Sequence, residues 1–404
     1  MIKRILYTLL IMFPVLASAQ INTDRVMAIG RNALYFEDYV LSIQYFNQVI
    51  NAKPYLSDPY FYRGLAKINL DDFQGAESDC SEAIERNPFV VSAYQVRGLA
   101  RIQQNNFAGA IEDYTKALEF DPENIGVWHN MALCRIRQED YKGAKNDLDK
   151  LIAISPRYTK AYLMRGEVDL KQKDTLAAEK DFGKAIEIDR YDADTWASRA
   201  ILRLQQQRYK DAEADFDHAI RLSTRNSGVY INRALARYHQ NNLRGAMSDY
   251  DIALDIDPNN FIGHYNRGLL RAQVGDDNRA IQDFNFVIEM EPDNMMAIFN
   301  RGLLLDQTGD YKGAIKDYST VINEYPNFLL GYQYRAQARR KIGDVKGADA
   351  DEFKVLKAQL DKQNGVDPNK QTADNTENNK TRKKSDKNMN NYRKIVVADN
   401  EEGE

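Results

Sequence analysis

Apolar residues recur along most of this chain at the spacing of amphipathic helices, and the whole pattern repeats. Matching stretches align with a period of 34 residues, without insertion, from Thr23 to Lys362. Each repeat holds one apolar helical pattern, a polar pair at positions 15 and 16, and a second helical pattern. In most repeats a proline at position 32 ends the second pattern, because proline cannot continue a helix. The sequence therefore predicts helical hairpins that stack, since one hairpin cannot bury both of its faces.

The register gives ten repeats over residues 23–362. They begin at Thr23, Ser57, Val91, Ile125, Thr159, Ala193, Ser227, Phe261, Met295 and Leu329. Position 8 is small in every repeat, which lets the two helices of a hairpin approach closely. Position 20 is alanine in nine repeats and position 24 is mostly aromatic. In period and in these positions the chain resembles the tetratricopeptide repeat family. The resemblance implies an all-α fold, an α-solenoid in which antiparallel helix pairs form one right-handed superhelix.

Charged residues also keep the register. Position 7 is arginine in eight repeats and position 23 is aspartate in nine. One interpretation is a basic ladder for an anionic ligand, and the other is a structural ion-pair ladder. A helical wheel turns position 7 toward the second helix, which carries position 23, and so favours the structural interpretation. The clearest predicted pairs are Arg63 with Asp79, Arg97 with Asp113, Arg267 with Asp283, and Arg301 with Asp317.

The resemblance places positions 2, 5, 9, 12 and 13 of the first helices along a concave groove. Apolar residues spread over this strip toward the C-terminal repeats, beside asparagines at position 6. Such a surface suits an extended peptide, because amides can hold its backbone while apolar residues take its side chains. The predicted partner groove consists of Asn232, Ile262, Tyr265, Asn266, Leu269, Met296, Phe299, Asn300 and Leu303. The alternative for Tyr265 and Phe299 is that they pack between neighbouring helices.

The two ends of the chain differ from the repeats. Residues 1–19 have the charged start, apolar run and small-residue cleavage site of a secretory signal peptide, which predicts export and cleavage near Ala19. We therefore expect a periplasmic or outer-envelope protein with no integral membrane segment after cleavage. Residues 20–362 form the repeat region. Residues 363–391 are rich in Asn, Lys and Asp and predict a disordered linker. Residues 392–404 begin with a short strand-like run, which could pair with a partner's sheet or open a further domain.

Composition and motifs narrow the function. The formal net charge of -4 at pH 7 gives no broad basic surface for nucleic acid. We find no catalytic constellation, metal-ligand motif or cofactor motif, and the two cysteines, Cys80 and Cys134, fall in different repeats. The favoured prediction is a non-catalytic scaffold of the bacterial cell envelope that binds a protein or peptide of unknown identity. Two alternatives remain: the regulatory portion of a larger enzyme, and a binder of glycans or anionic polymers through the arginine ladder.

Overall fold

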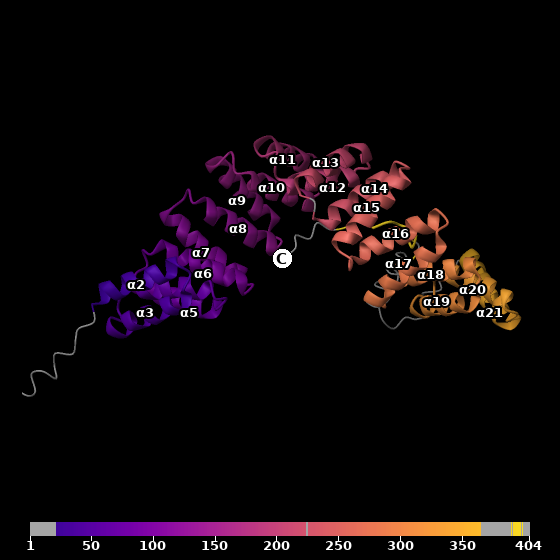
Figure 1. Ribbon diagram of the computed structural model, residues 1–404, viewed down its shortest axis with the longest axis horizontal. Helices are drawn as coiled ribbons and strands as arrows, with labels where there is room; N and C mark the ends of the chain where they lie inside the picture. The colour runs from indigo at the N-terminus through magenta and orange to yellow at the C-terminus, as the bar shows by residue number, and fades with distance from the viewer. Residues whose placement is uncertain (1–21, 224, 365–388, 390, 397, 399–404) are drawn as a thin grey trace, which may run out of the picture. The chain divides into compact units, whose positions relative to one another are not determined.

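The chain folds into helices in tandem (Figure 1). The computed structural model describes residues 22–223, 225–364, 389, 391–396 and 398. These residues contain twenty helices and no strand. They divide into two compact parts, Met1–Asp189 and Arg190–Glu404, each of which is described by itself. The predicted signal peptide and most of the predicted linker lie outside the described residues.

The N-terminal part contains α2 (Thr23–Tyr35), α3 (Tyr39–Ala52), α4 (Asp58–Ile68), α5 (Phe73–Arg86), α6 (Val91–Gln103), α7 (Phe107–Phe120), α8 (Ile125–Arg137), α9 (Tyr141–Ile154), α10 (Thr159–Lys171) and α11 (Thr175–Ile188). The C-terminal part contains α12 (Ala193–Gln205), α13 (Tyr209–Leu222), α14 (Ser227–His239), α15 (Leu243–Ile256), α16 (Phe261–Gln273), α17 (Asp277–Met290), α18 (Met295–Thr308), α19 (Tyr311–Glu324), α20 (Leu329–Lys341) and α21 (Val345–Gln363).

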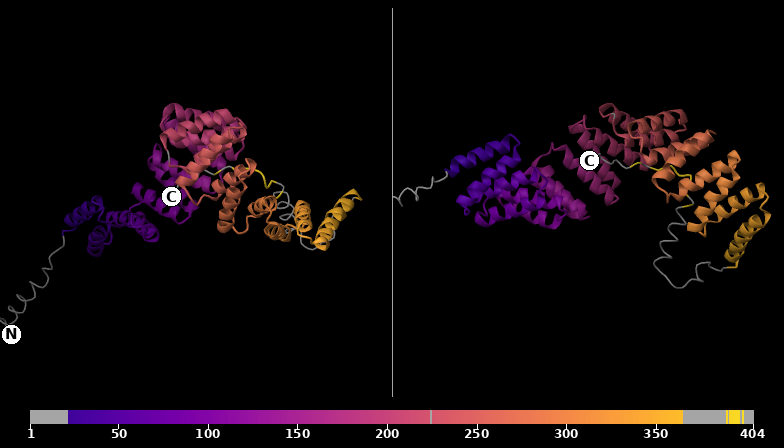
Figure 2. Two further views of the ribbon diagram at one scale, coloured as in Figure 1. Left: turned by 45° about the vertical axis from the view of Figure 1, so that its right-hand side comes forward. Right: turned by 60° about the horizontal axis from the view of Figure 1, so that its bottom comes forward.

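Each even-numbered helix packs against the helix that follows it, as α14 does against α15. Within each part, each odd-numbered helix also packs against the next pair, as α13 does against α14. The first helix of every pair begins at the first residue of a predicted repeat, except that α4 begins at Asp58 instead of Ser57. The views in Figure 2 show the same succession of pairs within each part. The predicted all-α solenoid of helix pairs is therefore confirmed.

The polar pair at positions 15 and 16 makes the turn inside each hairpin. Position 15 has a positive φ in every pair among the described residues, as at Asn105 (58°) and Gly309 (94°). Position 16 then caps the second helix: the Asn106 side chain accepts a hydrogen bond from the Gly109 amide at 3.1 Å. A left-handed residue followed by a cap reverses the chain within two residues, which explains why the period tolerates no insertion.

Close contact between paired helices depends on the small residue at position 8. A Cβ on Gly98 would lie 2.8 Å from the ring of Tyr114, and one on Gly302 would lie 2.9 Å from the ring of Tyr318. Tyr114 and Tyr318 occupy position 24 and are buried. The aromatic ring of the second helix therefore fills the space that a side chain on the first helix would need.

The predicted ion pairs form inside the hairpins. The Arg267 guanidinium contacts the Asp283 carboxylate at 2.7 Å, and Arg97–Asp113 and Arg301–Asp317 repeat this distance. Arg63 pairs with Asp79 in the same way at 2.5 Å. In these four pairs the carboxylate is 2% to 4% exposed and the arginine side chain is 15% to 23% exposed. The carboxylate is thus buried beneath the guanidinium that neutralises it.

Two further sets of contacts join these pairs into a ladder. A second arginine, at position 11, shares the same aspartate: Arg271 contacts Asp283 at 2.8 Å. The first arginine also reaches back to position 25 of the preceding repeat, as in Arg267 to Asp251 at 2.9 Å and Arg301 to Asn285 at 2.8 Å. Sequence analysis missed position 25, where the signal was a polar residue in successive repeats. The ladder therefore links neighbouring hairpins as well as the two helices of one hairpin.

Asp283 is the most heavily paired of these carboxylates. Burial alone would raise its pKa, but hydrogen bonds from His264 and Arg267 outweigh burial and hold the pKa below its ordinary value. We expect Asp283→Ala to lower the free energy of unfolding by about 1 to 3 kcal/mol, because it leaves cationic partners unpaired. Urea denaturation measures this loss. Asp255→Ala, which removes an exposed carboxylate from α15, is the matched control and should change stability little. An equal effect of the two substitutions would contradict the ladder's structural role.

One hairpin departs from the ladder. In α8 the position of the first arginine is taken by Met131, so Asp147 depends on Arg135 alone, at 2.8 Å and without hydrogen-bond geometry. Burial outweighs this contact and raises the pKa of Asp147 to about 6. The raised pKa means that the folded state holds this proton more tightly than the unfolded state. The contribution of Asp147 to stability therefore falls as pH rises from about 4 to about 6.

We expect Asp147→Asn to raise the free energy of unfolding at pH 7 by roughly 1 to 2 kcal/mol, because it removes a poorly compensated buried charge. The gain should vanish below about pH 4, where the carboxylate is protonated in both states. Melting curves between pH 4 and pH 7.5 test this dependence. Asp113→Asn is the control, since Asp113 pairs with both Arg97 and Arg101 and its loss should destabilise. A destabilised Asp147→Asn variant at pH 7 would show that the prediction is wrong.

Candidate functional site: an asparagine ladder that holds an extended segment

Three asparagines at one repeat position line the C-terminal part. Asn232 lies on α14, Asn266 on α16 and Asn300 on α18, each at position 6 of its repeat. All three bond to the main chain of a segment near the C-terminus of the same chain. We call the described residues of this stretch, 389, 391–396 and 398, the docked segment. It is the yellow stretch beside α16 in Figure 1.

Asn266 and Asn232 hold the docked segment in the same way. The Asn266 side chain donates to the Val396 carbonyl at 2.7 Å and accepts from the Val396 amide at 2.8 Å. Asn232 makes the corresponding two bonds to Ala398, both at 2.9 Å. A side-chain amide can donate and accept at the same time, so it satisfies both main-chain groups of one residue as a neighbouring strand would. These contacts recognise main chain and are indifferent to the side chain of the residue held.

Asn300 and Tyr265 hold the docked segment at its other end. The Tyr265 hydroxyl donates to the Tyr392 carbonyl at 2.6 Å, and the Asn300 side chain donates to the same oxygen at 2.5 Å. Burial raises the pKa of Tyr265, so its hydroxyl keeps the proton that it donates. Both lone pairs of this carbonyl are therefore used, which fixes the point where the docked segment enters the ladder.

The docked segment runs opposite to the order of the repeats. Tyr392 lies at Asn300, Val396 at Asn266 and Ala398 at Asn232. Neighbouring asparagines are one repeat apart. The docked segment advances two residues from Asn266 to Asn232, but four residues from Asn300 to Asn266. A turn accounts for the longer step, since the Lys394 amide bonds to the Asn391 carbonyl at 2.7 Å. The docked segment is thus turned at its start and extended at its end.

Every third residue of the docked segment turns its side chain toward the helices: three of these side chains are buried and that of Tyr392 is half-buried. Met389, Ile395 and Ala398 are 2%, 9% and 3% exposed, and the Tyr392 ring meets the Phe299 ring edge-on at 4.7 Å between centroids. Arg393, Lys394 and Val396 are exposed. Met389 packs in the cluster around Phe299 and Phe328, and Ile395 packs in the cluster around Leu235. Main-chain bonds therefore hold the docked segment, and a three-residue pattern of apolar side chains sets its register.

Five of the nine residues of the predicted groove contact the docked segment directly, and the other four pack against the apolar clusters that it joins. The three asparagines and Tyr265 bond to it directly. Leu269 packs against the cluster that contains Ile395, and Ile262 against the cluster that contains Ala398. Met296 and Leu303 pack against the cluster that contains Met389 and Phe299. The structure thus brings the predicted residues together around one occupant.

Tyr265 and Phe299 are both groove and core. Tyr265 is 4% exposed and meets Phe284 of the next helix edge-on, while its hydroxyl faces the docked segment. Phe299 is fully buried and contacts Tyr318, Phe328 and Tyr334 as well as Tyr392. Each ring therefore packs between neighbouring helices and also contacts the docked segment. Alanine at either position would disturb the fold as well as the groove.

The nine predicted residues are only part of this site. Leu204, Leu235 and Phe328 also contribute to the clusters under the docked segment, and Met389 falls in the range predicted to be a linker. The burial of the leucine at position 9 differs along the chain: Leu99 is 40% exposed, whereas Leu235, at the same position beneath the docked segment, is 4% exposed. The strand-like run from Tyr392 was recognised, but its described residues contain no strand and lie on the chain's own helices.

Other kinds of site are not evident in the described part of the chain. It contains no group of histidine, cysteine and carboxylate side chains that could hold a metal ion. No helix among these residues is long and apolar enough to cross a membrane. Cys80 and Cys134 are free and buried, and burial raises the pKa of the Cys80 thiol to about 12, so it is protonated and unreactive at neutral pH.

Solved structures similar to this chain are distant. A tetratricopeptide repeat protein from Parabacteroides merdae is 21% identical, with 62% of this chain and 98% of that one covered and a TM-score of 0.48. The C-terminal part of a TPR repeat-containing protein from Cytophaga hutchinsonii is 15% identical, with 68% and 98% covered and a TM-score of 0.47. YrrB, described as a TPR protein with an unusual peptide-binding site, is 20% identical, with 46% and 95% covered and a TM-score of 0.38. No curated protein matches the chain.

Family models match the repeat region directly. The model described as TPR repeat matches residues 98–134. Models described as Tetratricopeptide repeat match residues 125–158, 159–192, 198–261 and 265–327. Together these ranges cover more than half of the chain, and they fall on helices paired in the predicted register. The chain belongs to the tetratricopeptide repeat family.

Proposed function

We propose that this protein is a non-catalytic scaffold of the bacterial cell envelope that binds extended peptide segments of partner proteins along α14, α16 and α18. The observation that supports it is the asparagine ladder, which already bonds to the main chain of the docked segment at Tyr392, Val396 and Ala398. Membership of a repeat family that serves protein interactions agrees with this role. The envelope location rests on the predicted signal peptide alone.

Main-chain recognition makes the groove open to other occupants. The bonds from Asn232 and Asn266 use only the amide and carbonyl of the residue held, which every amino acid except proline supplies. A partner segment with apolar side chains at the spacing of Tyr392, Ile395 and Ala398 would meet the same contacts. The docked segment therefore marks a binding site and at the same time competes for it.

The arginine ladder gives no comparable support for binding an anionic polymer. The guanidinium of Arg233 is 12% exposed and bonds to Asp249 and Asp217. Arg267 likewise bonds to Asp283 and Asp251. Arg301 bonds to Asp317 and Asn285. An anion would have to displace a buried carboxylate to reach them, and that would cost the pairing that joins the helices.

The ladder's grip on the docked segment can be measured in the intact chain. We expect Asn266→Ala to increase hydrogen exchange at the Val396 amide by roughly 5- to 100-fold, because it removes two hydrogen bonds worth about 1 to 3 kcal/mol together. The melting temperature of the helices should stay within a few degrees. Asn130→Ala is the matched control, since Asn130 holds the same repeat position on α8. Unchanged hydrogen exchange at the Val396 amide in the Asn266→Ala variant would show that the asparagine ladder does not hold the docked segment.

Binding in trans tests the function itself. An attached segment competes at an effective concentration on the order of mM, so the chain's own segment must first be weakened. We define the open-groove variant as the full chain carrying Tyr392→Ala and Ile395→Asp. We expect a fluorescent peptide of residues 388–400 to bind it at least tenfold more tightly than it binds the unmodified chain, by fluorescence anisotropy.

The controls separate groove binding from non-specific adhesion. A peptide of the same composition in scrambled order should bind the open-groove variant at least tenfold more weakly than the native peptide, because it keeps the main-chain bonds but loses the register of the apolar side chains. Adding Asn232→Ala and Asn266→Ala to the open-groove variant should weaken the native peptide by tenfold or more, because four hydrogen bonds to its main chain are lost. If the native peptide binds the open-groove variant no better than the scrambled one, the proposed function is wrong.

A further inference from the structure

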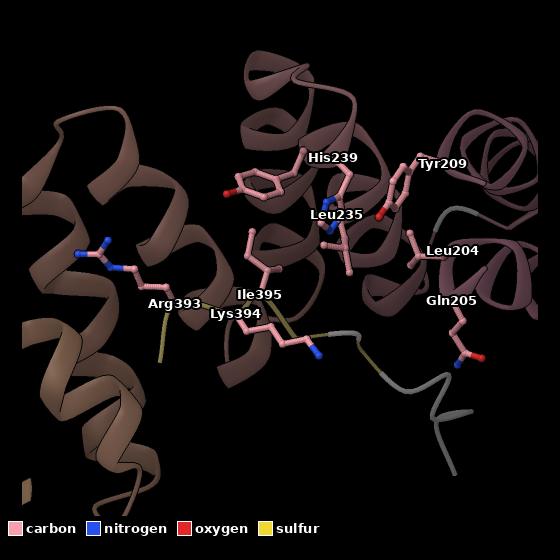
Figure 3. A pocket seen from close by; sticks show the side chains of 9 residues that line it. Leu204, Gln205, Tyr209, Leu235, His239, Arg393, Lys394 and Ile395 are labelled. Carbon is pink, nitrogen blue, oxygen red and sulfur yellow. The ribbon is translucent and has the colours of Figure 1, made fainter. Parts of the chain in front are cut away.

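Beside Ile395 the described residues leave a pocket of about 310 Å³ that is partly open to solvent. The helices line it with Leu204, Gln205, Tyr209, Leu235, Tyr238 and His239, and the docked segment lines it with Arg393, Lys394 and Ile395. Figure 3 shows Ile395 on one side of this pocket and Leu204 with Tyr209 on the other. The pocket is continuous with the groove, because Leu235 and Ile395 belong to the same apolar cluster.

The pocket leaves a large unfilled volume beside the Ile395 side chain. An apolar cavity of about 150 Å³ in another protein is large enough to bind benzene. The space beside Ile395 is roughly twice that volume, so an aromatic ring placed at this position of a bound peptide has room. Tyr209 and Leu204 lie across the pocket from Ile395 (Figure 3), so a larger side chain at this position has these residues as possible contacts.

The walls of the pocket suit an aromatic ring in particular. Tyr209 and His239 stack with 4.5 Å between ring centroids and 12° between ring planes. Tyr238 meets His239 edge-on at 5.4 Å. Leu204 and Leu235 are each 4% exposed and supply an apolar floor. A further ring could pack edge-to-face on this group, a geometry that adds to the gain from burial alone.

We propose that the groove selects partner segments that carry phenylalanine or tryptophan at the place of Ile395, and that such segments displace the docked segment. The partner is an extended peptide stretch with an aromatic side chain three residues before this position, as at Tyr392, and a small one three residues after it, as at Ala398. This inference rests on the proposed function and specifies the ligand of that same site. The chain's own isoleucine is then a weaker occupant, which a matched partner can replace.

The test compares peptides that differ at one residue. The open-groove variant is titrated with the peptide of residues 388–400 carrying isoleucine, phenylalanine, tryptophan or alanine at position 395, and affinity is read by anisotropy. We expect the phenylalanine or tryptophan peptide to bind about tenfold more tightly than the isoleucine peptide, because the added ring is buried against aromatic walls. The alanine peptide should bind about tenfold more weakly than the isoleucine peptide.

A substitution in the pocket wall gives a matched control. Leu204→Phe in the open-groove variant fills the pocket from the helix side. It should abolish the preference for an aromatic residue at position 395, measured as the ratio of the affinities of the phenylalanine and isoleucine peptides for the same variant. Tyr209→Leu removes one aromatic wall without closing the pocket and should reduce the preference severalfold. If the preference survives both substitutions, the inference is wrong, because the ring must then bind elsewhere.

The intact chain offers a second measurement that needs no added peptide. Ile395→Phe in the otherwise unmodified chain should slow hydrogen exchange at the Val396 amide by about tenfold, because the docked segment then fills the pocket itself. If the isoleucine peptide binds but aromatic peptides bind no better and Ile395→Phe does not slow exchange, the inference is overturned and the proposed function stands. If no peptide binds, the proposed function fails and the inference fails with it.

Discussion

The buried aspartate at position 23 is the interaction on which the rest of the structure depends. Asp283 accepts from Arg267 and Arg271 of the paired helix, and Arg267 also reaches Asp251 of the preceding hairpin. Asp283 is 2% exposed, so rotating or sliding the first helix would break buried ion pairs at a large cost. Packing alone fixes the distance between these helices. The ion pairs fix their rotation about their own axes.

The rotation of the first helices about their axes sets the direction in which the three asparagine side chains point. Each asparagine directly precedes a ladder arginine in the sequence, as in Asn266–Arg267 and Asn300–Arg301. Successive residues on a helix point about 100° apart, so an arginine locked onto the second helix turns its neighbour toward the other side. Asn266 can then bond to Val396 while Arg267 bonds to Asp283. One dipeptide thus couples the structural face of the helix to the face that binds.

Most of the fold followed from the sequence because the repeat is enforced by local chemistry. Positions 8, 15, 16 and 24 each have a steric or hydrogen-bonding reason that recurs in most hairpins, so one register predicted where the first helix of nearly every pair begins. The groove could also be placed, since asparagines and apolar residues share one side of α14, α16 and α18. Its occupant could not, because the contact between Asn232 and Ala398 joins residues 166 apart in the chain. No periodicity links such positions, and the repeat offers no rule for where a segment outside it will bind.

Two different kinds of contact hold the docked segment in the groove, one to its main chain and one to its side chains. Hydrogen bonds from the asparagines satisfy the main chain of any extended occupant, and this supplies a grip that does not depend on sequence. Selectivity is left to the apolar side chains at every third residue, and these are unequally matched to their sites. Tyr392 is well packed against Phe299, whereas Ile395 borders unfilled space. A segment that fitted perfectly and was tethered to the same chain would exclude every competitor. Under the proposed function, the unfilled space beside Ile395 leaves a partner segment a way to bind more tightly than the tethered one.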